Sequence, residues 1–297
     1  MARFFLLALL VALSTQAQAG VLTNGALTVT LRSNGAIDSA VFGKANFFKP
    51  GDGTDISNFG LQNGTDTNTF LLNDTNGGSQ LSLIEAGFSY SGSHSWGSNA
   101  DFDYLRSYSL IAGLNALRVT TTITNRGLAS FTVSHFDTFD PDQGYGALLG
   151  PPSLAAFETY NDVFDLAGGR VGQASIDRNG SHLTVLAGSF DSRAVIASGA
   201  PRQISDGSDL NGFFQAPTDR NGMLEDEGTH IGFRQLLNVN QSTTFTYILA
   251  FGANPNDAQQ AFTLASGPLA SVPEPNSLAV FGAMGLSLLL LRRKNAT

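Results

Sequence analysis

Alternation of apolar and polar residues runs through most of the chain between Gly20 and Gly267, and it constrains the fold more than any other feature. Clear examples are residues 27–31 (LTVTL), 117–120 (LRVT) and 245–249 (FTYIL). A period of two residues puts alternate side chains on opposite faces of a β-strand, so these segments are expected to be half-buried strands. Threonine, valine, isoleucine and phenylalanine dominate them and favour strands, and 22 phenylalanines supply a large core.

Turn residues separate these strands and predict hairpins. Asn34-Gly35, Asn125-Arg126-Gly127 and Asn179-Gly180 each lie between two alternating segments, as in turns that need a positive φ. Further strands are expected at 81–90, 105–111, 194–197 and 230–239. One short helix is expected at 256–262 with Asn256 as its N-cap, and residues 202–223 are expected to form an irregular loop.

The fold class predicted from this pattern is all-β, with a single large antiparallel β-sandwich over residues 20–267 and a linker at 268–271. The preferred form resembles the galactose-mutarotase-like supersandwich. Two smaller sandwiches divided near Pro151-Pro152 are the alternative.

Composition excludes several classes of function. The chain of 297 residues contains no cysteine, which rules out disulfide scaffolds, cysteine-ligated zinc or iron–sulfur sites and cysteine nucleophiles. The net charge is −8 and no basic stripe is present, so nucleic acid is not expected to be a partner.

The N-terminus has the three parts of a secretory signal peptide. Arg3 precedes an apolar run from Phe4 to Leu13, and a small-x-small site, Ala17-Gln18-Ala19, precedes Gly20. We therefore expect residues 1–19 to direct export through the Sec machinery and to be removed before Gly20.

The C-terminus carries a second targeting signal. Val272, Pro273, Glu274 and Pro275 precede an apolar span at 278–291, and Arg292, Arg293 and Lys294 follow it. The span predicts a short transmembrane helix, and the cations favour the cytoplasmic side. By these physical criteria a plain membrane anchor remains an alternative to a processed signal.

These features together resemble the PEP-CTERM sorting signal over residues 272–297. The resemblance implies processing by an exosortase in a Gram-negative bacterium that makes extracellular polysaccharide. It also implies transient anchoring in the inner membrane, followed by a cell-surface or extracellular location. It covers none of the folded domain, so it implies a destination and no activity.

His135 is the candidate for sugar chemistry. The segment Ser134-His135-Phe136-Asp137 loosely resembles the segment in which mutarotase-like epimerases place a histidine before an aromatic residue. General acid–base catalysis also needs a carboxylate at hydrogen-bond distance, and no carboxylate falls in a matching motif. Trp96, in a loop of small polar residues, is a second candidate sugar contact, through stacking.

Asp137, Asp140 and Asp142 form the best candidate for a structural calcium site, because calcium takes several oxygen ligands from carboxylates and carbonyls on loops. The competing interpretation is that these aspartates only shape a turn. No other cofactor is expected.

The function expected from the sequence is that of an exported, non-enzymatic cell-surface or extracellular-matrix protein with no catalytic residue. The alternative is a carbohydrate-binding or sugar-active, mutarotase-like β-sandwich on the same export route. Extracellular polysaccharide is a candidate partner under either hypothesis.

Processing at both ends gives a first testable prediction. We expect the native protein to begin at Gly20 and to lack residues 278–294, because both ends carry cleavable signals. Mass spectrometry of the two termini of protein from its native host measures this directly. A native protein that keeps residues 278–294 contradicts the processing and favours the plain anchor.

Overall fold

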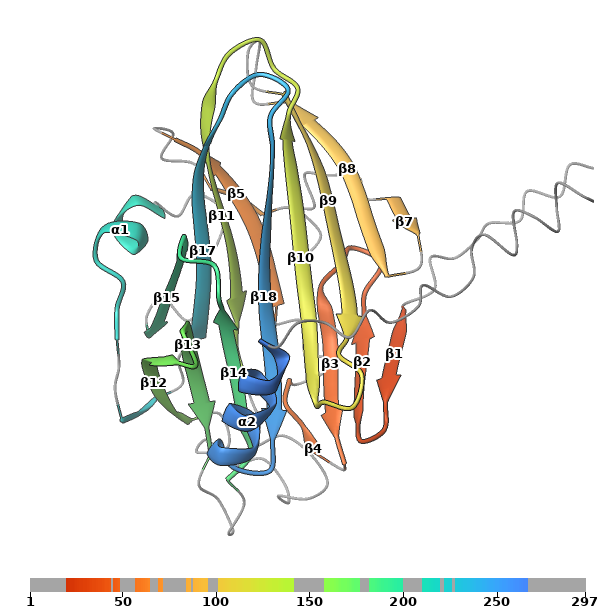
Figure 1. Ribbon diagram of the computed structural model, residues 1–297, viewed down its shortest axis with the longest axis vertical. Helices are drawn as coiled ribbons and strands as arrows, with labels where there is room; N and C mark the ends of the chain where they lie inside the picture. Colours follow the sequence, from red (N-terminus) through yellow and green to blue (C-terminus); the bar gives the residue numbers. More distant parts are fainter. Residues whose placement is uncertain are drawn as a thin grey trace, which may run out of the picture. The chain divides into compact units, whose positions relative to one another are not determined.

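The chain folds as antiparallel β-sheets, as the computed structural model shows (Figure 1). The structure describes residues 20–43, 45–48, 57–64, 69–71, 84–86, 88–95, 101–141, 158–176, 182–199, 210–219, 222–225 and 228–266. All of these lie in one compact unit, Met1–Ser266. The signal peptide, Trp96, Asp142 and the sorting signal lie outside the described residues. Neither helix in the described part is long and apolar enough to cross a membrane.

The strands of the described residues are arranged in three sheets. The first contains β1 (Val21–Asn24), β2 (Leu27–Leu31), β3 (Ile37–Phe42) and β4 (Ala45–Asn46), in that order. The second has nine strands in the order β16 (Met223–Glu225), β12 (Thr159–Leu166), β13 (Gly169–Ser175), β14 (Thr184–Ser189), β18 (Ser242–Gly252), β10 (Ala116–Asn125), β9 (Asp101–Leu110), β8 (Ser89–Ser95) and β7 (Ile84–Ala86). The third has five strands in the order β15 (Ala194–Gly199), β17 (Gly228–Leu237), β11 (Phe131–Phe139), β5 (Ser57–Asn63) and β6 (Thr69–Leu71).

The inner faces of the nine-stranded and five-stranded sheets pack against each other through aromatic side chains. Phe59 of β5 stacks on Tyr104 of β9 with ring centroids 5.7 Å apart, and Phe233 of β17 stacks on Phe245 of β18 at 4.9 Å. Because alternate residues of each strand point inward, one contiguous core unites the two sheets. The prediction of an all-β, antiparallel fold is confirmed.

Two of the three predicted hairpins have described strands that pair. β2 pairs with β3, with Gly35 at a φ of 82° in the turn between them, and β13 pairs with β14. Strands from both sides of Pro151-Pro152 pair within each large sheet, as β10 does with β18 and β11 with β17. The chain is therefore not divided into two sandwiches at that point.

The predicted hairpin at Asn125-Arg126-Gly127 is wrong. β10 and β11 belong to different sheets, and this segment carries the chain from one layer to the other. Asn125 is fully buried there. Its Oδ1 accepts a hydrogen bond from the Gly127 amide at 2.8 Å, and its Nδ2 donates to the carbonyls of Ala129 and Leu237 at 2.9 and 3.1 Å. The sequence signal specified a local turn, which does not say which strands will pair.

Both helices differ from expectation. α1 (Leu210–Gln215) lies within the segment predicted to be an irregular loop, where Leu210 packs on Phe136 of β11. α2 (Pro255–Ala265) packs on the outer face of β14 and β18, and its N-cap is Asn254 instead of Asn256 (Figure 1). The helix starts earlier because Pro255 is compatible with its first turn and the Asn254 side chain accepts from the Asp257 amide at 3.0 Å.

The cap of α2 gives a stability prediction. Asn254→Ala should lower the free energy of unfolding by about 1 kcal/mol, because it leaves an amide of the first turn without its acceptor. Gln260→Ala, on the exposed side of the same helix, is the control and should change stability little. Urea unfolding of both variants measures the difference, and equal stabilities would contradict the assigned cap.

Candidate functional site

The predicted site residue His135 points into the sandwich core, beside a fully buried ion pair. Arg106 of β9 donates from Nη2 to Asp137 Oδ1 of β11 at 2.5 Å and from Nη1 to Oδ2 at 3.3 Å. Its remaining hydrogen bonds go to the hydroxyls of Tyr108, Thr121 and Tyr247 at 2.5, 3.2 and 2.8 Å. The guanidinium also lies 4.2 Å from the centroid of the Phe59 ring. We call these residues the inner network.

Charge and burial make the inner network an unsuitable catalytic site. Burial raises the pKa of the Asp137 carboxyl, and the Arg106 guanidinium opposes that shift. Burial, reinforced by the nearby Arg106 charge, holds the pKa of His135 well below its usual value, so this imidazole is neutral. Its Nε2 lies 3.3 Å from the Tyr104 hydroxyl, and its Nδ1 is 3.7 Å from Asp137 Oδ2, too far for a hydrogen bond. The His135 ring is stacked between the rings of Tyr104 and Phe245 inside the core, which suits a structural role.

The candidate calcium ligands do not come together in the described residues. Asp137 is bound to Arg106, and Asp142 lies outside the described range. Asp140 is buried next to the end of β11. Within the described part of the chain, no three acidic or histidine side chains form a group able to hold a metal ion.

The outer face of the five-stranded sheet presents a different set of polar residues. Gln62 of β5 pairs with Ser134 of β11, which pairs with Arg234 of β17, so these residues form one row across three strands. Phe59, Leu61 and Val133 point into the core, so the row between them points outward. Arg234 donates from Nε to Ser134 Oγ at 2.9 Å, which leaves the serine O–H free to donate. We call Gln62, Ser134 and Arg234 the outer row.

Gln62 is the unusual member of the outer row. Its side chain is completely buried, yet neither its carboxamide oxygen nor its nitrogen has a hydrogen-bond partner. Buried amides in proteins nearly always have partners, because an unmade hydrogen bond costs about 1–3 kcal/mol. The carboxamide retains two donors and an acceptor for a ligand.

Helix α1 places aromatic rings next to the outer row. The Arg234 guanidinium lies 4.3 Å from the centroid of the Phe214 ring and donates from Nη2 to Asn211 Oδ1 at 2.8 Å. Phe213 and Phe214 fit over Gly232, where an added Cβ would collide with Phe213 Cε1. A glycine on β17 is therefore required for α1 to approach the sheet closely.

His230 of β17 lies on the same outer face but in a different row. Its Nε2 is 3.1 Å from the Gly199 carbonyl and its Nδ1 is 3.2 Å from the Thr138 hydroxyl. The nitrogen facing the carbonyl must be the donor, so Nδ1 accepts from Thr138. Both ring nitrogens are thus engaged, which suits a structural role.

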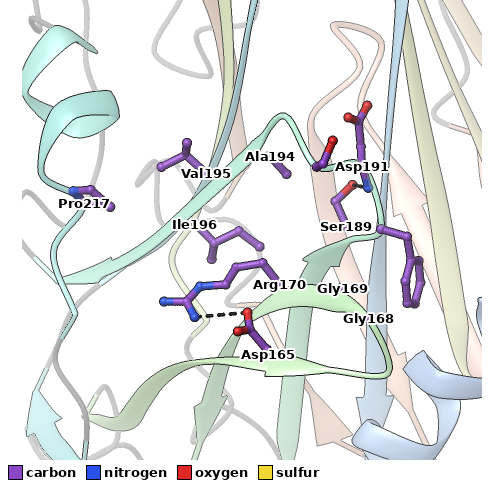
Figure 2. A pocket seen from close by; sticks show the side chains of 12 residues that line it. Asp165, Gly168, Gly169, Arg170, Ser189, Asp191, Ala194, Val195, Ile196 and Pro217 are labelled. Carbon is purple, nitrogen blue, oxygen red and sulfur yellow. Dashed lines mark hydrogen bonds and ion pairs between the residues drawn. The ribbon is translucent and has the colours of Figure 1, made fainter.

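A cleft of about 560 Å³ opens beside β15, as Figure 2 shows. Asp165 and Arg170 form an ion pair of 3.1 Å on one wall, and Ile196 and Pro217 contribute apolar surface. Hydrogen bonds from Arg193 hold the pKa of Asp191 below its ordinary value. The charged groups of this cleft are paired, Asp165 with Arg170 and Asp191 with Arg193.

Sequence reasoning did not single out the outer row. Gln62, Ser134 and Arg234 are 72 and 100 residues apart along the chain, and no short motif joins them. Ser134 and Arg234 lay on predicted strands whose partners were unknown, and Gln62 lay in a segment interpreted as a loop, which the structure shows to be β5.

No protein-family model matches the chain, and no curated protein matches it in sequence. Several solved structures are similar in fold. A putative aldose 1-epimerase from Escherichia coli K12 has 13% identity and a TM-score of 0.41, over 79% of this chain and 99% of that one. A galactose mutarotase-like protein from Lactobacillus casei has 9% identity and a TM-score of 0.41, over 79% of this chain and 100% of that one. A bacterial glucoamylase complexed with acarbose has 13% identity and a TM-score of 0.47, over 84% of this chain but 34% of the enzyme.

The comparison corrects the expected function. The prediction of a non-enzymatic surface or matrix protein is wrong, because the similar structures are of the aldose epimerase and mutarotase type and favour the sugar-active alternative. At these identities and TM-scores the likeness assigns no role to any residue. Only this chain's own side chains can therefore indicate its function.

The inner network predicts how the protein responds to alkali. Burial raises the pKa of Tyr108 from 10.0 to about 12 and also raises the pKa values of Tyr104 and Tyr247. A folded-state pKa above the unfolded value gives stability that is complete below pH 10 and is lost as the pH rises through about 12.

Near-ultraviolet absorbance of tyrosinate should therefore show these three of the six tyrosines ionising only as the protein unfolds. Circular dichroism recorded on the same samples reports the unfolding. Ionisation of all six while the strand signal is intact would contradict the buried network.

Proposed function

We propose that the chain is a carbohydrate-active β-sandwich protein that binds a neutral sugar on the outer face of its five-stranded sheet. The observation that carries the proposal is the fully buried Gln62 carboxamide without a partner, in line with Ser134 and Arg234. The sandwich is proposed to be of the supersandwich form.

The outer row matches the chemistry of a sugar. Sugar hydroxyls both donate and accept hydrogen bonds, and the row offers an amide with both functions, a hydroxyl and a guanidinium. The neighbouring Phe213 and Phe214 supply apolar surface of the kind that lines small-molecule sites. A free carboxylate would favour a charged amine, and none of the outer row residues has one.

The described residues of this face can bind a sugar, but they do not include a complete acid–base pair. Chemistry at a sugar ring needs a proton acceptor and a proton donor at hydrogen-bond distance from the reacting atoms. Asp137 and His135 face the opposite side of β11, inside the core. The outer row is accordingly the part of the site that holds and orients the sugar.

We further propose that the protein reaches its place of action by export. The signal peptide at 1–19 and the PEP-CTERM-like signal at 272–297 support this route, with an exosortase as the processing partner. A neutral extracellular glycan then provides the sugar. The candidate calcium site at Asp137, Asp140 and Asp142 is no part of this proposal.

Replacing Gln62 separates ligand binding from folding. Gln62→Leu should raise the free energy of unfolding of the free protein by about 1–3 kcal/mol, because it removes an unpaired buried amide. The same change should weaken binding of a neutral sugar at least about tenfold, since about 1.4 kcal/mol of lost hydrogen bonding is a factor of ten.

The matched control is Gln173→Leu, because the Gln173 carboxamide is also buried but accepts from Gln259 at 3.0 Å. This control should keep sugar binding. Saturation-transfer NMR with a panel of neutral mono- and disaccharides measures binding, and exchange between anomers in the same samples measures action on the sugar. The proposal fails if no sugar binds saturably, or if Gln62→Leu binds as the unaltered protein does.

A further inference from the structure

The outer face of the nine-stranded sheet changes character along β10 and β18. At one end, Ala116, Ile248 and Ala250 are covered by α2 and pack on Phe262. Beyond the helix, the outward positions of the same two strands carry hydroxyl groups. Three cross-strand pairs follow one another: Thr120 with Thr246 at 3.3 Å, Thr122 with Thr244 at 2.9 Å and Thr124 with Ser242 at 2.8 Å.

The hydroxyl pattern continues onto β9 and β8. Ser107 pairs with Thr120 on one side and with Ser89 on the other, which extends the first row to four strands. The third row contains Asp103 and Ser93. Because strands lie about 4.8 Å apart and outward residues about 6.8 Å apart along a strand, these groups form a regular grid. We call it the hydroxyl face.

The hydroxyl face contains its own concavity and one ion pair. A cleft of about 500 Å³ lies over β8, β9 and β10, with Ser93, Leu105, Thr122 and Arg126 among its lining residues. Asp103 accepts from Arg126 Nε at 2.6 Å and from Ser93 Oγ at 2.7 Å, and these two bonds hold the pKa of Asp103 below its ordinary value. Its negative charge is therefore matched by a neighbouring cation.

Leu105 is the apolar exception in the grid. Its side chain is 46% exposed, between Ser91 of β8 and Thr122 of β10. Sugar rings have hydroxyls at their edges and apolar C–H faces, so one exposed aliphatic side chain among hydroxyls matches a ring lying flat on the sheet.

We propose that the hydroxyl face binds a neutral polysaccharide chain, at a site separate from the outer row. Each serine and threonine hydroxyl both donates and accepts, as sugar hydroxyls do, so a repeating neutral polymer finds a partner at each row. Single contacts of this kind are weak in water, but a polymer engages many together and gains affinity by multivalency. The chain's net charge of −8 disfavours an anionic polymer.

The separation from the outer row follows from topology. β8, β9, β10 and β18 belong to the nine-stranded sheet, and Gln62, Ser134 and Arg234 belong to the five-stranded sheet. Each set points away from the shared core, so the two sites lie on opposite outer faces of the sandwich. The polysaccharide site therefore does not depend on the function proposed for the outer row.

Affinity electrophoresis in gels containing dextran or another neutral glucan tests the proposal, with alginate as the anionic comparison. The double variant Thr122→Val with Thr244→Val removes the central hydroxyl pair while keeping β-branched side chains that suit strands. We expect this double variant to lose at least tenfold in affinity for the glucan that retains the unaltered protein. Alginate should retain neither the unaltered protein nor the variants.

Thr23→Val with Thr28→Val is the matched control, because these residues form an exposed hydroxyl pair at 3.5 Å on β1 and β2. This control should keep the affinity of the unaltered protein. Thermal unfolding of every variant verifies that the fold is retained. The proposal is overturned if no neutral polysaccharide in the panel retains the protein, or if the Thr122 and Thr244 variant is retained as strongly as the control.

Discussion

The buried ion pair between Arg106 and Asp137 is the interaction on which the rest of the sandwich depends. It joins β9 of one sheet to β11 of the other, and every hydrogen bond that it needs comes from inside the core. Removing one partner of such a pair leaves an uncompensated buried charge and costs about 3–5 kcal/mol. The pair also requires the observed register of β11 with β5 and β17, because a shift of one residue would turn Asp137 to the outer face.

This constraint also determines where ligand binding can occur. Arg106, Asp137, Tyr108 and Tyr247 are hydrogen-bonded to one another inside the core, so a sugar could use these groups only at the cost of the fold. The side chains on the outer faces take no part in this ion-pair network. On one of them Gln62 keeps an unused carboxamide, and on the other the threonine pairs of β10 and β18 form a neutral, hydrogen-bonding surface.

The sequence was sufficient to predict several of the strands, but it missed β5 and β12 and did not predict the site. The alternation in residues 27–31 and 245–249 identified strands because burial of one face imposes a period of two on any such sheet. The same pattern could not show that β10 and β11 separate into different layers, since a turn motif describes local backbone geometry and not strand partners. One source of error at the site was which face each residue of a strand occupies. Ser134-His135-Phe136-Asp137 alternates between faces, and the side facing the core depends on Val133 and Phe139, which pack there.

Gln62 illustrates a second limit of sequence reasoning. A glutamine in a strand is ordinarily an exposed polar residue, and its complete burial depends on what folds over that face. The candidate site thus emerges only when pairing of β5, β11 and β17 brings Gln62, Ser134 and Arg234 into one row. The hydrogen-bonding groups of the site come together only in the assembled sheet.

The central claim is that a sugar is held by the outer row, and side-chain amide NMR tests it most directly. In ¹⁵N-labelled protein, the Nε2 hydrogens of Gln62 are assigned by their absence in Gln62→Leu. Addition of a sugar that binds should shift this resonance at saturating concentration and slow its exchange with water, while the Gln173 amide stays unchanged. A sugar that binds saturably and leaves the Gln62 resonance in place would contradict the account.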